Sequence, residues 1–370
     1  MPVVLALLLA VAAAPPLARA EPPALPGPQG ALGPQGALGP QALRAAYSGP
    51  PAGWPAPLID PGIAFVELDA APPASSPAPD RVALGARLFH DPGLSVDGTI
   101  ACATCHAPEH GFSVGTPLAR GVGGVAGRRH PPALVAVSWQ SAFDWDGRSA
   151  DLAARVLTPL TAPGEMGNDT LGMVLARIAA SPDAAVFAHV FPGEGVTARS
   201  LGAALTAYLA GLDGPSRFDR FAAGDSAALD DQEIAGLHLF RTKARCANCH
   251  FGPGLADGLF HNLRLSFFGE PAEDLGRIAV TGRPEDAGRF RTASLRHISA
   301  SAPYMHNGLF PTLEGVVRFY DRGGGEVWAR NAGEAARPLY PHAARRAAPL
   351  RPLGLSDAEQ AALVAFLRCL

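Results

Sequence analysis

The chain has 370 residues, a length that suggests two domains. Its formal net charge is −3, so composition gives no reason to expect nucleic acid or an acidic membrane surface as a partner. Glycine and proline are abundant, at 42 and 37 residues, whereas aromatic residues make up only 7% of the chain. This composition, together with scarce strand-like alternation, predicts a mainly α fold with long loops.

The N-terminus has the pattern of a secretory signal. An apolar run over 3–14 precedes Ala18-Arg19-Ala20, a small-residue cleavage pattern. We therefore predict a signal peptide over 1–20 and a periplasmic location. The run is too short to cross a bilayer and no other apolar stretch reaches spanning length, so we expect no membrane span.

Residues 21–79 are predicted to be a tether and a lead-in. A Gly-Pro-Gln-Gly-Ala-Leu unit at 27–32 repeats at 33–38, and such low-complexity sequence is typical of a flexible linker. A proline-rich lead-in then runs to Asp80, and we expect it to lie extended over the first folded domain.

Two C-x-x-C-H motifs, at 102–106 and 246–250, carry the chemistry of the chain. In this pattern the two thiols can form thioethers with the vinyl groups of a haem, and the histidine that follows ligates the iron. We therefore predict two covalently bound c-type haems. The predicted attachment residues are Cys102, Cys105, Cys246 and Cys249, and the predicted iron ligands from the motifs are His106 and His250.

Other uses of these cysteines fit less well. Structural zinc usually pairs two C-x-x-C units about 15 to 20 residues apart, and the gap here is far longer. Neither motif lies in a βαβ pattern, as a thioredoxin-like dithiol would, and disulfides would not require a histidine after each second cysteine. Cys369, in the last predicted helix, is expected to be a free packing thiol.

A similar helical pattern precedes each motif. Leu88 and Phe89 end an apolar stripe before the first motif, and Leu239 and Phe240 occupy similar places before the second. This likeness predicts an internal duplication of cytochrome c-like domains, at 80–224 and 225–370. Further helical patterns lie at 151–158, 170–180, 197–212, 312–320 and 356–370, the last with a Ser356/Glu359 capping box.

Several ordered motifs after each haem sequence resemble those of the bacterial dihaem cytochrome c peroxidase / MauG family. The resemblance covers about 82–322, most of the chain that follows the predicted signal. It implies that the first domain carries the peroxidatic haem and the second the electron-transfer haem. The motifs are FDWDGR at 143–148, Pro159, Glu165-Met166, SLR at 294–296, APYMHNG at 302–308 and TLE at 312–314.

Two positions favour the MauG-like members of the family. The peroxidases carry a distal histidine in a Gly-His-Gly segment, and the matching residues here are Gly121-Val122-Gly123. Valine cannot ligate iron, so the first haem is expected to be five-coordinate. On the second haem, Tyr320 stands where the peroxidases have a methionine, and a phenolate should lower the iron potential. Met305 is the rival to Tyr320 as the ligand.

The resemblance also implies roles around the first haem. Glu165 would move the proton of the bound peroxide, Pro159 would shape the pocket, and Trp145 would relay electrons between the haems. Arg155 stands where the family usually has a glutamine. It would either polarise the peroxide or pair with a haem propionate. His130 is a rival that would close the first haem.

An interhaem calcium ion is a further implication of the resemblance. The family usually offers an asparagine side chain after an arginine, but Arg129 is followed here by His130. Imidazole is a poor calcium ligand, which disfavours calcium in this chain.

Three functions are open from the sequence. The first is a peroxidase that uses hydrogen peroxide to oxidise a partner, including a protein side chain as MauG does. The second is a peroxide-detoxifying cytochrome c peroxidase fed by a small cytochrome c or a cupredoxin. The third is a non-catalytic dihaem electron carrier, against which Val122 and Glu165 argue. The family suggests a monomer or a homodimer.

Overall fold

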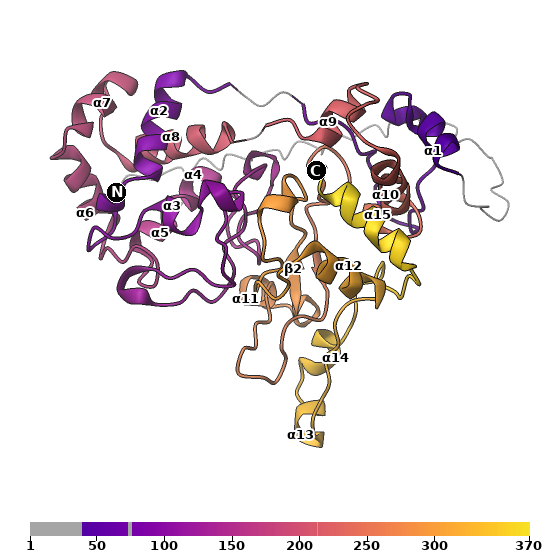
Figure 1. The fold of residues 1–370 in the computed structure, drawn as a ribbon. Coiled ribbons are helices and arrows are strands. Elements are labelled where there is room, and N and C mark those ends of the chain that lie inside the picture. Colours follow the sequence, from indigo (N-terminus) through magenta and orange to yellow (C-terminus); the bar gives the residue numbers. More distant parts are fainter. Residues whose placement is uncertain (1–38, 73–75, 213) are drawn as a thin grey trace, which may run out of the picture. The chain divides into compact units, whose positions relative to one another are not determined.

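Two pairs of crossed helices organise the computed structural model, which describes residues 39–72, 76–212 and 214–370. Helix α2 (Pro79–Phe89) packs on α8 (Ala198–Ala210), and α10 (Asp231–Arg241) packs on α15 (Asp357–Leu367) (Figure 1). Both pairs belong to one compact unit, Gly39–Leu370. The predicted signal peptide and the repeats before Gly39 lie outside the described residues.

A glycine allows each pair of helices to cross closely. A Cβ atom added to Gly85 of α2 would lie 2.0 Å from the carbonyl oxygen of Ala204 in α8. A Cβ atom added to Gly236 of α10 would lie 2.0 Å from the carbonyl oxygen of Ala362 in α15. Real Cβ atoms do not approach backbone oxygens so closely, so both crossings depend on the missing side chain.

Each helix pair has its own apolar core. The first cluster surrounds α2 and α8 and includes Leu84, Leu88 and Leu201, all with no exposed surface. The second cluster surrounds α10 and α15 and includes Ile234, Phe240 and Phe366, also with none. Each cluster lies beside one of the two C-x-x-C-H motifs, so the helix pairs form the scaffolds of the two sites.

The lead-in differs from its predicted position. We expected it over the first domain, but Tyr47 and Leu68 belong to the second cluster. Arg241, which has no exposed surface, explains the difference: it forms an ion pair with Glu67 and donates to the Tyr47 hydroxyl (2.9 Å). A buried guanidinium needs such partners, so α10 holds the lead-in on this side.

The predicted helices are present, with some differences at their ends and within one of them. The patterns at 170–180, 197–212, 312–320 and 356–370 correspond to single helices, and Thr170, Thr197, Thr312 and Ser356 cap them with side-chain acceptors. The pattern at 151–158 instead gives the short helix α4 (Leu152–Arg155), and a second short helix, α5 (Thr158–Thr161), begins only at its last residue. The remaining α-helices are α1 (Pro40–Tyr47), α3 (Cys102–Cys105), α4 (Leu152–Arg155), α5 (Thr158–Thr161), α6 (Leu171–Ala179), α7 (Asp183–Val190), α9 (Arg217–Ala222), α11 (Ile278–Thr281), α12 (Leu313–Asp321), α13 (Ala332–Ala335) and α14 (Tyr340–Ala343).

Among the residues that the structure describes, strands occur in one small sheet. Strands β1 (Phe260–Asn262) and β2 (Arg289–Arg291) pair antiparallel, with His261 opposite Phe290. The mainly helical fold that we predicted is therefore confirmed. Short 3₁₀ turns lie at Pro51–Gly53, Pro92–Leu94, Pro108–His110, Val122–Gly124, Val137–Trp139, Cys246–Asn248, Pro284–Asp286 and Ile298–Ala300.

In the described part of the chain, no single helix is long and apolar enough to cross a membrane. Helices α6 and α7 meet the length and hydropathy criteria only as a pair, and they are bent by 95° to one another.

The close crossing at Gly236 gives a stability prediction. Gly236→Ala places a methyl group against the α15 backbone and should destabilise the fold by about 1–3 kcal/mol. Gly172→Ala is the control, because it lies on an exposed part of α6 with its nearest neighbouring atom at 3.7 Å. Thermal unfolding should show a lower melting temperature for Gly236→Ala alone. Equal melting temperatures would contradict the role of this crossing.

Candidate functional site

The first motif presents His106 in one defined tautomer. Cys102–Cys105 form the single turn α3, and the main-chain N–H of His106 donates to Cys102 O (2.9 Å). The ring Nδ1 lies 3.0 Å from the carbonyl oxygen of Phe112. A carbonyl only accepts, so Nδ1 carries the proton and Nε2 is left with a free lone pair. Burial lowers the pKa of His106 to about 4, which keeps the ring neutral and able to ligate a metal.

The second motif repeats this arrangement. The main-chain N–H of His250 donates to Cys246 O (2.9 Å), and the ring Nδ1 donates to Leu255 O (3.0 Å). Burial lowers the pKa of His250 as well. The Asn248 amide between the cysteines donates to Leu58 O (3.0 Å) and accepts from the main-chain N–H of Asp60 (2.8 Å), so the lead-in holds this motif.

The motif cysteines are not paired with one another. No described cysteine forms a disulfide, and burial raises the pKa of Cys102 and of Cys246 to about 12 each. Cys369 is also free and buried, next to the Arg217 guanidinium (3.5 Å). This agrees with the packing role predicted for it.

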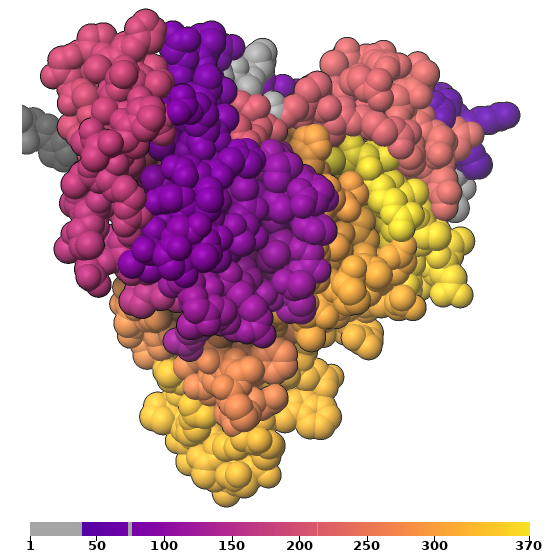
Figure 2. All heavy atoms as spheres, turned by 60° about the vertical axis from the view of Figure 1, so that its left-hand side comes forward, coloured from indigo at the N-terminus to yellow at the C-terminus, as the bar shows by residue number. Residues whose placement is uncertain are grey.

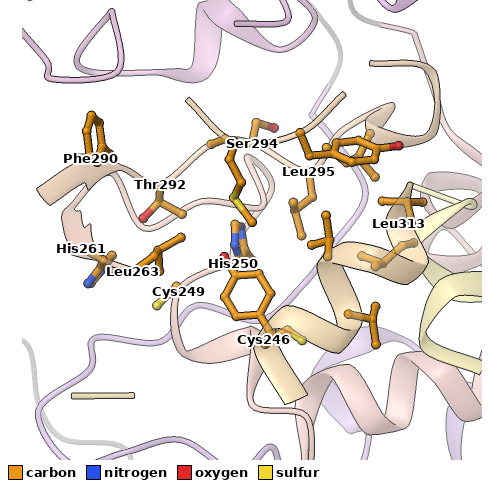
Figure 3. A pocket seen from close by; sticks show the side chains of 18 of the residues that line it. Cys246, Cys249, His250, His261, Leu263, Phe290, Thr292, Ser294, Leu295 and Leu313 are labelled. Atoms are coloured by element: carbon orange, nitrogen blue, oxygen red, sulfur yellow. The ribbon is translucent and has the colours of Figure 1, made fainter. Parts of the chain in front are cut away.

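The second motif faces a cavity of about 210 Å³ whose lining suits a haem (Figure 3). Cys246, Cys249 and His250 lie on its wall, and apolar side chains make up most of the rest. An apolar macrocycle that is tethered at two thiols and ligated by one imidazole needs such a lining. The apolar lining includes Leu263, Leu265, Leu313, Val316, Val317 and Leu363.

Both candidate sixth ligands of this site line the same cavity. Tyr320 and Met305 belong to its wall together with His250. Burial raises the pKa of the Tyr320 phenol, and the charges of Cys249 and Cys246 raise it further, which places the phenol near the attachment cysteines. A buried phenol ionises readily only when a cation compensates its charge, as an iron would do.

His261 lies beside Cys249 in the second cavity (Figure 3). Its Nε2 is 2.6 Å from a carboxylate oxygen of Asp257. Burial is the largest influence and opposes its protonation, but the interactions with Asp257 and Cys249 together outweigh burial and raise the pKa to about 10. The side chain is thus held in an ion pair with Asp257.

Glu165 lies near the first motif. Its charge raises the pKa of both Cys102 and Cys105, so the carboxyl is close to the attachment thiols. One side of Glu165 is exposed to solvent, yet the surrounding protein raises its pKa by desolvation, and Arg155 opposes this increase. Pro159 supports the turn that carries Glu165, because its carbonyl oxygen accepts from the main-chain N–H of Met166 (3.1 Å).

Arg155 has a partner that the sequence did not reveal. Its Nε lies 2.7 Å from Asp144, and the side chains of both are largely buried. The sequence left two roles open for Arg155, polarising the peroxide or pairing with a haem propionate, and neither of them includes this ion pair. Asp144 also accepts from the Ser149 hydroxyl (3.0 Å) and holds a positive φ of 64°, so its side chain is fixed. The only feature of the sequence that pointed to the Asp144–Arg155 pair was the acidic residue next to Trp145.

Trp145 joins the surroundings of the two motifs. Its indole N–H donates to His130 O (2.7 Å), its ring lies edge-on to His306 with the ring centroids 6.3 Å apart, and it lines the second cavity. The main-chain N–H of His130 in turn donates to His306 O (2.7 Å). The chain segments around these residues also meet at the surface, in purple and orange in Figure 2.

His130 does not offer a free nitrogen. Its Nε2 lies 2.9 Å from the Ser113 hydroxyl, and its Nδ1 faces the carbonyl oxygens of Thr116 (3.2 Å) and Pro117 (3.1 Å). Both nitrogens are engaged, so the side chain fits neither a ligand of the first haem nor a calcium ligand. The residue that stands at the calcium position therefore does not fit that ion.

An ion-pair network supports the Trp145 segment. Arg129 binds Asp274 through two nitrogens (2.6 and 2.9 Å) and Asp146 through a third (2.7 Å). Arg148 binds Asp146 as well (2.6 Å). Burial opposes ionisation of Asp146, but the hydrogen bonds from Arg148 and Arg129 outweigh it and hold its pKa at about 2.

Comparisons with known proteins agree with this site. A family model described as di-haem cytochrome c peroxidase matches residues 79–227. The chain is 37% identical over 304 residues to the methylamine utilization protein MauG of Methylorubrum extorquens, covering 81% of this chain and 80% of that protein. It is 33% identical over 348 residues to the cytochrome-c peroxidase IdrP2 of Denitromonas iodatirespirans, covering 84% and 89%. Among solved structures, a MauG-like protein associated with microbial copper homeostasis aligns with a TM-score of 0.70 and 30% identity, covering 84% of this chain and 95% of that one.

The low pKa of Asp146 predicts a pH-dependent stability. The depressed pKa stabilises the fold above about pH 4, and this contribution is lost as the pH falls from about 4 to 2. Asp146→Asn should therefore be less stable than the wild type at pH 7, by on the order of 2 kcal/mol, and this difference should shrink toward pH 2. Denaturant unfolding across this range measures it. Asp169→Asn, which changes an exposed carboxylate, is the control, and parallel curves for Asp146→Asn and the wild type would contradict the prediction.

Proposed function

We propose that this chain, which belongs to the dihaem cytochrome c peroxidase family, reduces hydrogen peroxide at its first haem. The electrons would come from a protein partner and pass through the second haem. The chain is thus a haem peroxidase with two covalently bound c-type haems. When bound, the haems supply the iron that binds peroxide and the redox states that store electrons. The observation that carries the proposal is the contrast between the two motifs: Val122 near the first, and Tyr320 in the cavity of the second.

The two haem domains are part of this proposal. We assign the peroxidatic haem to 80–224 and the electron-transfer haem to 225–370. The matching crossings at Gly85 and Gly236 support an internal duplication, as do the matching hydrogen bonds of His106 and His250. Each haem would be held by the two cysteines and the histidine of its motif.

Glu165 is the proton carrier of the reaction. We assign it to accept the proton of the near peroxide oxygen and to return it to the far oxygen, which leaves as water. Desolvation raises its pKa, and this favours a carboxyl that takes a proton and then gives it up again. Arg155, held by Asp144, places a positive charge at the same site and compensates negative charge on the departing oxygen. Two electrons from the partner and two protons complete the conversion of hydrogen peroxide to two waters.

Trp145 is the connection between the two haems. Its ring lies on the wall of the second cavity, and the neighbouring Asp144 binds Arg155 of the first site. An aromatic ring at this place shortens the distance that electrons must cross. The hydrogen bond to His130 O and the Arg129 network keep the ring fixed.

The proposed reductant is an exported protein whose side chain is oxidised. The relative with 37% identity carries the name methylamine utilization protein MauG, and Tyr320 is the feature of this chain that favours the MauG-like members. The second candidate is peroxide detoxification with a small cytochrome c or a cupredoxin as donor, as the peroxidase relatives suggest. The signal pattern at 1–20 supports a periplasmic location for either reaction.

Variants of the second cavity test the Tyr320 assignment. Tyr320→Phe should remove the sixth ligand, so the low-spin signal of the second haem in electron paramagnetic resonance should disappear. Met305→Leu is the matched control and should leave that signal in place. The opposite pattern would make Met305 the ligand. Tyr320→Met should also raise peroxidase turnover with a reduced small cytochrome, and robust turnover in the wild type would favour detoxification.

Removal of the Glu165 carboxyl tests the peroxidatic role. Glu165→Gln keeps the shape of the side chain but cannot accept a proton, so the rate constant for reaction with peroxide should fall by about 100-fold or more. Stopped-flow absorbance of the oxidised protein measures it. Glu109→Gln, which changes an exposed carboxylate near the same motif, is the control. An unchanged rate constant in Glu165→Gln would remove Glu165 from the mechanism.

A further inference from the structure

Two loops interlock beside Glu165. The first spans 119–127 and folds back on itself, because Arg120 and Ala126 pair as an antiparallel bridge. The second is the turn 162–167, in which the main-chain N–H groups of Glu165 and Gly167 both donate to Ala162 O at 3.0 Å. Neither loop belongs to a long helix, so their contacts with each other decide where the Glu165 carboxyl lies.

The first contact joins the two main chains. The N–H of Val122 donates to Glu165 O at 2.9 Å. A Cβ atom added to the preceding Gly121 would lie 2.1 Å from Gly164 O and 2.5 Å from Glu165 O. No side chain larger than hydrogen fits there, so the hydrogen bond forms only because residue 121 is a glycine.

In the second contact the glycine belongs to the 162–167 turn and the side chain that fits against it belongs to the 119–127 loop. A Cβ atom added to Gly167 would lie 2.7 Å from Cγ2 of Val122 and 3.3 Å from Cγ1 of Val96. The Val122 side chain therefore occupies the space that Gly167 leaves open. The main-chain N–H of Val96 donates to Met166 O (2.9 Å) and holds the turn from a second side. Each loop thus provides a glycine notch into which the other fits.

We propose that Gly121 and Val122 are positioning residues for peroxide reduction, because their interlock with the 164–167 turn holds the Glu165 carboxyl at the first haem. The inference rests on the role proposed for Glu165. In this proposal Val122 has a structural role in addition to leaving the iron without a protein ligand. The structure shows the interlock closed.

The electrostatics of Glu165 offer a readout of the interlock. Desolvation by the surrounding protein raises the pKa of Glu165, while Arg155 and Arg148 oppose this and Asp144 supports it. If the turn separates from the 119–127 loop, the carboxyl loses the protein that covers its other side, and its pKa falls toward the ordinary value. The acid limb of the peroxide reaction should then move to lower pH, which a loss of overall stability would not cause.

Gly121→Ala is the direct test, with Gly127→Ala as its matched control on the same loop. A Cβ atom added to Gly127 has its nearest neighbours at 3.6 Å, an ordinary contact. In the holoprotein, Gly121→Ala should slow the reaction with peroxide by about 10- to 100-fold and move its acid limb to lower pH. The Val122 amide should also exchange hydrogen faster. Carbon monoxide binding to the reduced first haem needs no proton transfer and should be unchanged.

Two further variants keep the test decisive if Gly121→Ala does not fold. Val122→Ala empties the space over Gly167 and should show the same changes more weakly. Val122→Ile fills that space and should keep the wild-type values. The inference fails if Glu165→Gln slows the reaction but Gly121→Ala and Val122→Ala match Gly127→Ala. If Glu165→Gln itself reacts like the wild type, the proposed role of Glu165 fails instead.

Discussion

The hydrogen bond from each motif histidine to a main-chain carbonyl is the constraint on which the rest of the structure depends. His106 donates to Phe112 O and His250 to Leu255 O, both at 3.0 Å, so each ring is fixed with Nε2 free. The accepting loops are positioned by the helix pairs that cross at Gly85 and Gly236. A close helix crossing and a fixed imidazole are therefore provided twice in one chain, once for each haem.

The surroundings of the two haem motifs differ at the residues to which we assign different roles. Beside the first motif, Val122 offers no ligand and interlocks with the turn of Glu165. Beside the second motif, Tyr320 and Met305 both line the cavity that the attachment residues also line. Trp145 and the Arg129 network lie between these surroundings and are held by buried ion pairs. The proposed arrangement, an open first haem with Glu165 as proton carrier next to a closed second haem, is one that a peroxidase needs and an electron carrier does not.

Much of this could be predicted from the sequence, because motifs and helix caps are local. The cysteines, the motif histidines and the Ser356 cap follow from short spacings. Long-range contacts were not visible in the same way. The Asp144–Arg155 pair, the packing of the lead-in on Arg241 and the engagement of His130 join residues that no local pattern connects. The glycine notch at Gly121 was likewise hidden, because only the approach of Glu165 gives it meaning.

The spin states of the oxidised holoprotein test the central claim most directly. Electron paramagnetic resonance should show one high-spin five-coordinate haem and one low-spin haem, and one equivalent of peroxide should change the optical spectrum without prior reduction. This result would agree with an open site at Val122 and a closed site at Tyr320. Two low-spin haems that do not respond to peroxide would contradict the account and leave an electron carrier.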